Sequence, residues 1–442
     1  MPVPASTNYR VEYAVKSDVG MRRSNNQDAV VAIADPDQSN GRGSLFIVAD
    51  GMGAHAAGEL ASELAVKNVP HEYKMLRDRS APAALQQAVQ KVNGLIHAKG
   101  QSSPEFRGMG TTCANLLVLG DAALIAHVGD SRVYRLRELA LEQLTFDHSL
   151  VWELAKESKT TEEEIPSCIP KNIITRSLGP HPIVKVDLEG PFDLRAGDAY
   201  LICSDGLTGV VGDELIGGVL SAMPPDDAAQ TLVDLANLRG GPDNISVIVV
   251  RVDEAAGAAP EASKASGSTQ PCCASYQSDP VRWLAMAVTG VCLAVVIWCI
   301  REQQTWGAVA AAIGLGGAAV RALGRSTHPR QTPGLDTLGG PYGSAPYRHC
   351  DCRNGDQVVQ HLQGVVQELS GLRSATAGHN GAAKVDWASF DEECQTAADC
   401  RDWRDSIAHY GAAIRALMKQ VRQAPEAVES AIGAPPRDSA IG

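Results

Sequence analysis

Four short motifs place an aspartate at the end or the start of an apolar run. They are SNNQD ending at Asp28, VADGMG at Asp50, CSDGL at Asp205 and GGPDN at Asp243. The last three aspartates are followed directly by a glycine or an asparagine, which favour tight turns. Carboxylates at the exposed ends of buried strands are typical of a hard-cation site. Because only oxygen ligands are offered, Mg²⁺ or Mn²⁺ is the cation that fits.

Each motif also has a purely structural interpretation, since Asp-Gly and Gly-Asp pairs form turns in many proteins without any chemistry. The four motifs together are more specific for a cation site than any one of them alone. Gly51 and Gly206 allow the backbone to bend close to an ion, and the Gly51 carbonyl can itself be a ligand. No histidine or cysteine belongs to the set, so a structural zinc site is disfavoured.

Composition limits the classes of protein. A chain of 442 residues is long enough for two or three units. Its net charge of −12 argues against a nucleic-acid binder, which normally presents a basic face. The 11 cysteines lack the spacing of a disulfide framework, which indicates reduced thiols in a cytosolic protein. No basic-then-apolar leader opens the chain, so we expect the first domain to stay in the cytoplasm.

Residues 1–253 are predicted to form one domain of the α+β class. Strand-like runs cover 9–15, 44–50, 112–120, 122–130, 131–137, 199–205 and 244–252, and helical spacing covers 58–76, 81–99, 213–221 and 226–238. The turns Gly120-Asp121 and Gly129-Asp130 favour hairpins. Hairpins flanked by helix pairs predict antiparallel sheets packed face to face and covered by helices on the outside.

The apolar run 281–300 predicts a membrane-spanning helix after a flexible linker over 254–280. It carries no charge after Arg282, and twenty helical residues span about 30 Å, the thickness of the hydrocarbon core. A second run covers 306–323. Arginines follow that run, so a hairpin over 281–323 keeps both ends in the cytoplasm, whereas a single span would place the first domain outside. We favour the hairpin; a buried core helix is the alternative for the first run.

The C-terminal part, 349–442, is predicted to be a helical tail after a second linker over 324–348. Apolar residues recur every three or four positions over 358–372 and over 403–421. Such a narrow seam suits either a helical hairpin, in which the two seams pack on each other, or a homodimer formed through the tail.

Taken together, the ordered motifs resemble the bacterial branch of the metal-dependent protein phosphatases, protein phosphatase type 2C. The resemblance covers residues 9–253 and rests on eight segments in the family order. They are 17-SDVGMRRSNNQD-28, 49-ADGMGAHAAGE-59, 109-MGTT-112, 129-GDSRVYR-135, 145-TFDHS-149, 175-TRSLG-179, 203-CSDGL-207 and 241-GPDNISV-247. It implies a four-layer αββα sandwich with two Mn²⁺ or Mg²⁺ ions at one edge.

The resemblance also assigns roles to residues. It implies that Asp50 bridges the two metal ions, that Asp205 and Asp243 hold the first, and that the Gly51 carbonyl holds the second. Asp28 would act mostly through a metal-bound water. Two further roles follow from the same resemblance: Arg23 would bind the phosphate group, and Asp130 with Asp205 would form a third, weaker metal site.

The implied reaction is hydrolysis of phosphoserine and phosphothreonine in proteins. Two divalent cations would lower the pKa of a shared water, and the resulting nucleophile would attack phosphorus in line while Arg23 offsets charge on the phosphoryl oxygens. Two positions depart from the family pattern. Gln27 stands where many members carry glutamate, and Met52 stands where animal relatives carry a histidine, which leaves the general acid unassigned. His55 is one candidate for that acid.

Three hypotheses follow. In the first, an active phosphatase works at the cytoplasmic face of the inner membrane, with its catalytic domain and tail in the cytoplasm and a membrane Ser/Thr kinase among its partners. In the second, the Gln27 change has weakened catalysis and the protein is a phosphoprotein-binding adaptor. In the third it is a membrane scaffold whose tail dimerises. We favour the first, because every expected direct ligand position is filled.

Overall fold

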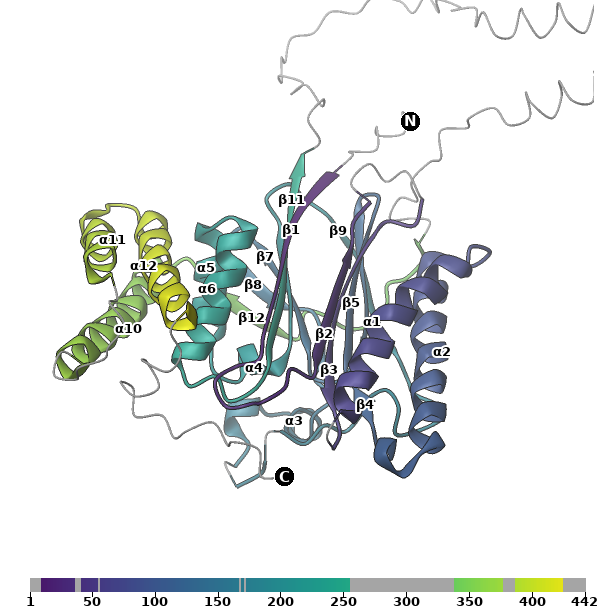
Figure 1. The fold of residues 1–442 in the computed structure, drawn as a ribbon. Coiled ribbons are helices and arrows are strands. Elements are labelled where there is room, and N and C mark those ends of the chain that lie inside the picture. Colours follow the sequence, from purple (N-terminus) through teal and green to yellow (C-terminus); the bar gives the residue numbers. More distant parts are fainter. Residues whose placement is uncertain are drawn as a thin grey trace, which may run out of the picture. The chain divides into compact units, whose positions relative to one another are not determined.

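Two antiparallel β-sheets form the centre of the molecule (Figure 1). The computed structural model describes residues 9–35, 41–54, 56–166, 168–170, 172–254, 338–376 and 386–423. Sheet A has the strand order β1 (Tyr9–Asp18), β11 (Ile245–Glu254), β10 (Ala199–Cys203), β7 (Arg132–Arg137), β8 (Ala140–Gln143) and β12 (Arg348–Asp351). Sheet B has the order β2 (Asp28–Ile33), β3 (Ser44–Met52), β5 (Cys113–Leu119), β6 (Ala122–Val128) and β9 (Asp187–Asp193), and the short β4 (Gly110–Thr111) pairs with β3.

Helices cover both outer faces of the sandwich. On sheet B lie α1 (Ala57–Met75) and α2 (Ala81–Ser102), and on sheet A lie α5 (Asp213–Ala222) and α6 (Pro225–Leu238). The shorter elements are α3 (Leu150–Ser158), α4 (Asp205–Thr208) and the 3₁₀ turns Pro104–Phe106 and Glu162–Glu164. The predicted αββα arrangement of two antiparallel sheets between helices is therefore confirmed.

The core has three apolar layers, as an αββα sandwich requires. Phe46, Leu116 and Ile248 belong to the layer between the two sheets. A second layer fills the space between sheet B and its helices, and a third lies between sheet A and its helices. Strands β5, β6 and β10 are buried on both faces, which explains why their sequences are continuously apolar and do not alternate.

One of the two predicted hairpins is wrong. Strands β5 and β6 do pair across the Gly120-Asp121 turn, with Leu119 opposite Ala122. Strand β7, however, belongs to the other sheet, so the chain crosses between layers at Gly129-Asp130. Gly129 adopts φ +114°, and a Cβ atom there would lie 2.5 Å from Thr112 Cβ, so this tight crossing requires glycine.

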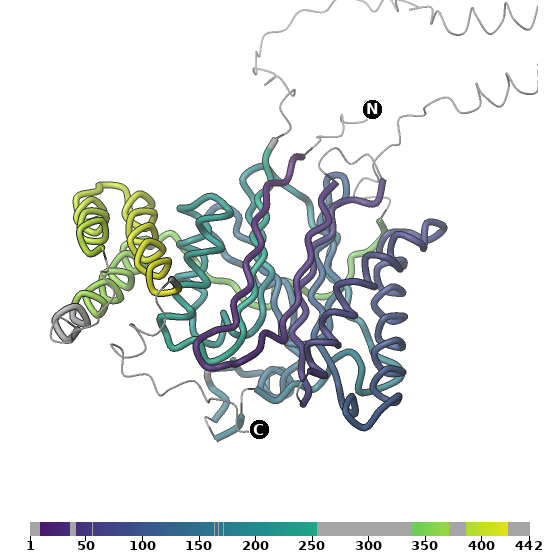
Figure 2. Tube along the Cα trace, in the orientation of Figure 1, coloured from purple at the N-terminus to yellow at the C-terminus, as the bar shows by residue number. Residues whose placement is uncertain are grey.

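Residues 338–352, which we term the strap, join the sandwich and differ from the linker predicted over 324–348. Tyr342 exchanges backbone hydrogen bonds with Gly190 at the edge of sheet B. Glu189, 2% exposed, accepts hydrogen bonds from the amides of Ser344 and Ala345 and from the Tyr347 hydroxyl. The strap then adds β12 to β8 of sheet A, and so lies along one edge of each sheet (Figure 2).

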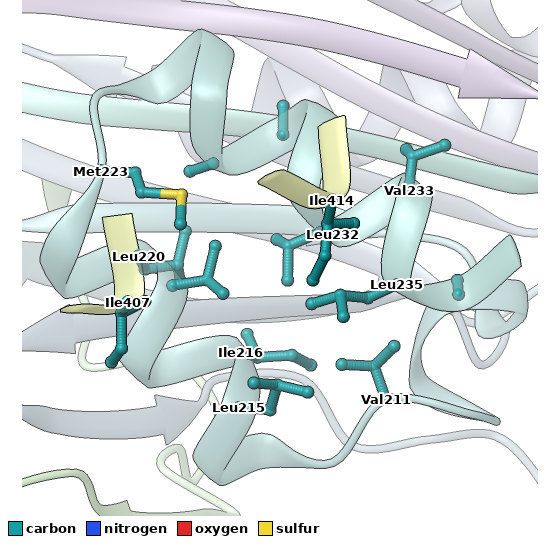
Figure 3. Close-up of a cluster of buried hydrophobic side chains, with 14 of the residues drawn as sticks. Val211, Leu215, Ile216, Leu220, Met223, Leu232, Val233, Leu235, Ile407 and Ile414 are labelled. Atoms are coloured by element: carbon teal, nitrogen blue, oxygen red, sulfur yellow. The ribbon is translucent and has the colours of Figure 1, made fainter. Parts of the chain in front are cut away.

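Of the C-terminal helices, α10 (Gly355–Thr376) and α12 (Trp403–Gln423) pack on the outer side of α5 and α6, and α11 (Trp387–Asp399) packs on α12. Ile407 and Ile414 of α12 lie among Leu220, Met223 and Leu232 (Figure 3). The apolar seam predicted over 403–421 is buried as expected, against α10 and α11 and also against α5 and α6 of the sandwich. A seam at helical spacing shows that one face is covered and does not identify what covers it.

The predicted membrane segments lie outside the described residues, as do most of both predicted linkers and His55. Among the helices that the structure describes, none combines the length and the apolar character needed to cross a bilayer.

Replacing Ile414 with alanine tests the docking of α12. Ile414 is fully buried, so Ile414→Ala should lower the free energy of unfolding by about 3 kcal/mol through lost burial and a residual cavity. Lys419→Ala on the exposed side of the same helix should change it by less than about 0.5 kcal/mol. Denaturant unfolding of the full chain measures both, and equal effects would contradict packing of α12 on the sandwich.

Candidate active site

Four of the predicted aspartates are gathered by the ends of strands from both sheets. The antiparallel pairing of β2 with β3 places Asp28 directly opposite Asp50. Asp205 begins α4 directly after β10, and Asp130 lies in the crossover that follows β6. Strand ends of the two facing sheets therefore meet at one place, as the sequence predicted.

The electrostatics of these carboxylates show how close together they are. The pKa of Asp28 is raised to about 7, first by burial and also by the charges of Asp205 and Asp243. The pKa of Asp50 lies well above its ordinary value, first because of burial and then because of Asp28, Asp205 and Asp130. Burial and the neighbouring Asp205 also raise the pKa of Asp130. Each carboxylate thus resists ionisation while its neighbours are charged.

Several oxygens of this cluster have no hydrogen-bond donor. Oδ1 of Asp28, of Asp130 and of Asp205 are buried and accept no hydrogen bond from the protein. A buried carboxylate oxygen without a partner is costly unless a cation or a water takes it up. The unpaired oxygens are hard donors, so these residues fit Mn²⁺ or Mg²⁺.

Within the described residues, no three histidine, cysteine, aspartate or glutamate side chains already surround a single point as ligands. Negatively charged carboxylates repel one another, so we expect them to surround a single point only when a cation is bound there.

Gly51 and Gly206 occupy positions that admit no side chain. A Cβ atom on Gly51 would lie 2.2 Å from the Gly58 carbonyl oxygen and 2.5 Å from that of Gln27. A Cβ atom on Gly206 would lie 2.0 Å from the Asn244 carbonyl oxygen. Glycine is therefore required next to Asp50 and Asp205 so that the surrounding backbone can approach.

Uncharged residues hold the aspartates in place, and sequence reasoning assigned them no role. Thr112 Oγ1 accepts a hydrogen bond from the Asp50 amide at 2.8 Å, and Thr111 Oγ1 donates to the Asp50 carbonyl at 2.9 Å. Ser204 Oγ donates to Asp28 Oδ2 at 2.8 Å. These residues belong to the motifs MGTT and CSDGL, so their place beside an aspartate in the sequence was the available signal.

Asn244 ties together the two loops that carry Arg23 and Asp243. Its Oδ1 accepts a hydrogen bond from the Gln27 amide at 2.8 Å, and its Nδ2 donates to the carbonyls of Val19 and Asn25. A side-chain amide is suited to this task, because it both accepts and donates. The residue was treated only as a turn former in the sequence.

Arg23 and Asp243 lie on the more exposed side of the cluster. Arg23 Nη2 donates to Asp243 Oδ2 at 2.8 Å, and the two side chains are 50% and 33% exposed. The guanidinium group therefore lies beside Asp243, and much of the Arg23 side chain is open to solvent. The structure brings Arg23 next to a predicted metal ligand, a contact that spacing in the sequence did not indicate.

His148 orders its loop. It is fully buried, its Nδ1 accepts a hydrogen bond from the Gly129 amide, and its Nε2 lies 2.9 Å from Asp187 Oδ2. Both ring nitrogens thus have protein partners.

Comparison with known proteins identifies this arrangement. The family profile for protein phosphatase 2C matches residues 21–234. A putative 2C-type protein phosphatase of Streptococcus pyogenes is 40% identical over 250 residues, an alignment that covers 54% of this chain and 97% of the relative. The chain belongs to the protein phosphatase 2C family. The predicted enzyme class, a protein-serine/threonine phosphatase, is therefore confirmed.

Other members of the protein phosphatase 2C family show similar identity. The serine/threonine protein phosphatase PstP of Mycobacterium tuberculosis is 38% identical over 242 residues, covering 55% of this chain and 45% of the relative. A crystal structure of the PstP catalytic domain in complex with 2 manganese ions is 37% identical, covers 56% of this chain and all of that chain, and gives a TM-score of 0.48. The strap and the helices α10–α12 lie beyond residue 234, where the matched family profile ends.

Asp205→Asn tests whether these aspartates form a cation site. Because Asp205 raises the pKa of Asp28, Asp50 and Asp130, the substitution should raise the unfolding temperature of the metal-free protein by relieving repulsion. It should also abolish the stabilisation by Mn²⁺, which for the unsubstituted chain is about 2.7 kcal/mol at 100 times Kd. Thermal unfolding with and without Mn²⁺ measures both effects.

Asp193→Asn is the control, because Asp193 lies at the opposite end of sheet B, next to the β5–β6 turn. It should keep the full response to Mn²⁺. An Asp205→Asn protein that Mn²⁺ still stabilises would contradict a cation site at this cluster.

Proposed function

We propose that this phosphatase hydrolyses phosphoserine and phosphothreonine in proteins with the help of two divalent cations, at the cytoplasmic face of a membrane. The observation that carries the catalytic part is the clustering of Asp28, Asp50, Asp130 and Asp205, three of which have a buried carboxylate oxygen that accepts no hydrogen bond. Such a cluster is stable only with cations or protons, and the 2 manganese ions bound by the PstP catalytic domain support cations.

Each residue of this site has its own proposed role. Asp50, Asp205 and Asp243 would hold two Mn²⁺ or Mg²⁺ ions together with the Gly51 carbonyl, and Asp130 with Asp205 would hold a third, weaker one. When bound, such ions supply a water activated near neutral pH and positive charge for the phosphoryl oxygens. Asp28, held by Ser204 through one oxygen, keeps its other oxygen free to orient that water.

Arg23 would bind the phosphate group. Its fork can donate two hydrogen bonds to a phosphoryl group, which a lysine cannot do with the same geometry. Its contact with Asp243 holds the side chain near the cations, so that one substrate oxygen can face the cations while another faces the guanidinium group. Charge that develops on the phosphoryl oxygens in the transition state is then offset from both sides.

The membrane part of the proposal rests on the apolar runs 281–300 and 306–323 and on one structural argument. Residues 9–254 and 338–423, which flank the apolar runs, fold into one unit through the strap, β12 and the packing of α12. Both flanks must therefore lie on the same side of a bilayer, so the chain between them crosses an even number of times. This argument supports the hairpin over a single span, and it agrees with the distribution of arginines.

Activity of the full chain tests the catalytic part. With Mn²⁺ or Mg²⁺ it should release phosphate from a phosphothreonine peptide, and with EDTA or as Asp205→Asn it should release none above background. Colorimetric phosphate release measures this. A metal-loaded native chain that binds the phosphopeptide and leaves it intact for hours would contradict the proposal and favour the adaptor hypothesis suggested by Gln27.

Reporter fusions test the topology. Alkaline phosphatase, which is active only outside the cytoplasm, should be active when inserted between residues 301 and 305 and inactive when fused after residue 423. A single span would instead give activity on only one flank of the folded unit, and activity after residue 423 would overturn the hairpin.

A further inference from the structure

Helix α12 reaches a loop that carries part of the active site. Arg422, near its C-terminal end, forms an ion pair with Asp234 of α6, and its Nε lies 3.7 Å from Asp18 Oδ2. Asp18 is the last residue of β1, five residues before Arg23. A single side chain of the C-terminal helices thus contacts both the helix on which they dock and the segment that presents the phosphate-binding arginine.

Asp18 fixes the turn that leads to Arg23. Its Oδ1 accepts hydrogen bonds from the Gly20 amide at 2.9 Å and from Asn237 Nδ2 at 3.2 Å. Gly20 adopts φ +79°, and a Cβ atom there would lie 2.2 Å from the Asp243 carbonyl oxygen. The turn capped by Asp18 is therefore pressed directly against the backbone of a predicted metal ligand.

The next residues of the turn rest on the same loop. The amides of Met21 and Arg22 donate to the Gly241 carbonyl at 2.9 and 3.2 Å. Arg23 follows immediately, and its guanidinium group meets Asp243. A continuous series of contacts therefore links Arg422, through Asp18 and the turn at Gly20, to Arg23 and Asp243. These last two residues would bind the phosphate group and a cation.

The charges explain why Arg422 matters to this chain of contacts. Asp234 is fully buried, and its pKa is raised to about 6, first by burial; the charge of Arg422 opposes this rise and the charge of Asp18 adds to it. Two carboxylates therefore face each other at the end of α6, and Arg422 is the cation that contacts both. Without it, Asp18 is repelled by Asp234 and loses a partner that fixes its position.

We propose that Arg422 is a positioning residue for phosphate recognition: from α12 it holds Asp18 and the turn at Gly20, and thereby holds Arg23 where the phosphate group binds. The inference rests on the proposed phosphatase function of the same site. It makes the docked C-terminal helices part of the substrate-binding apparatus, although no hydrogen bond or ion pair among the described residues joins their side chains to the aspartate cluster.

Kinetics of the full Mn²⁺-loaded chain test the proposal. Arg422→Gln combined with Asp234→Asn removes the contact to Asp18 without leaving a buried carboxylate unpaired. This double variant should raise KM for a phosphothreonine peptide by about three- to tenfold, with kcat within about twofold, because ground-state and transition-state phosphate contacts weaken together. The inhibition constant of inorganic phosphate should rise in parallel with KM.

Arg415→Gln is the matched control on the same helix. Arg415 docks α12 on α6 through Thr231 Oγ1 at 2.6 Å and Asp227 at 3.3 Å, and it has no contact with Asp18 among the described residues. It should leave KM and the phosphate inhibition constant unchanged. Arg422→Lys, which keeps the charge and loses the fork, should fall between the native chain and the double variant.

Two results would overturn the proposal. One is an unchanged KM in the double variant. The other is an equal change in both helix variants together with lower unfolding temperatures, which would mean that α12 acts through stability alone. If the native chain shows no turnover, the proposed function fails, and the dissociation constant of inorganic phosphate, measured by calorimetry on the Mn²⁺-loaded variants, then decides the role of Arg422.

Discussion

Mutual repulsion among buried carboxylates is the constraint around which this molecule is organised. Burial raises the pKa values of Asp28, Asp50 and Asp130. The charges of neighbouring carboxylates, Asp205 among them, raise these pKa values as well. No chain would hold these carboxylates together without a stiff frame. That frame is provided by the pairing of β2 with β3, by the tight crossing at Gly129, and by neutral donors such as Thr112 and Ser204. Binding of cations then converts an unfavourable arrangement into a reactive one.

Much of the fold could be predicted because burial leaves a pattern in the sequence. The apolar runs that became β3, β5, β6, β10 and β11 are continuous or alternating, and their ends were placed within a few residues. Strand β8 has only four residues and β9 contains Gly190-Pro191, so neither shows a clear strand pattern. Periodicity also cannot say which sheet a strand joins, and this is why the turn at Gly129 was misread.

The predicted site residues differ from the missed ones in charge. Clustered aspartates beside glycines are unusual enough to be noticed, whereas Asn244, Thr112 and Ser204 are ordinary turn and strand residues until their partners are known. The C-terminal helices illustrate the same limit at a larger scale. Their seams indicated burial, but the covering surface on α5 and α6 lies almost two hundred residues earlier in the chain and is recognisable only in three dimensions.

The strap has a consequence for the order in which the protein matures. A ribosome delivers residues 9–254 first, and at that moment the edges at β8 and β9 and the outer face of α5 and α6 are still bare. Residues 338–423 emerge only after the long apolar stretch has been synthesised. The nascent enzyme therefore reaches its finished form late, once that stretch has left the ribosome. A newly made copy is thus incomplete until its last hundred residues arrive, and translation itself delays the appearance of a fully assembled hydrolase.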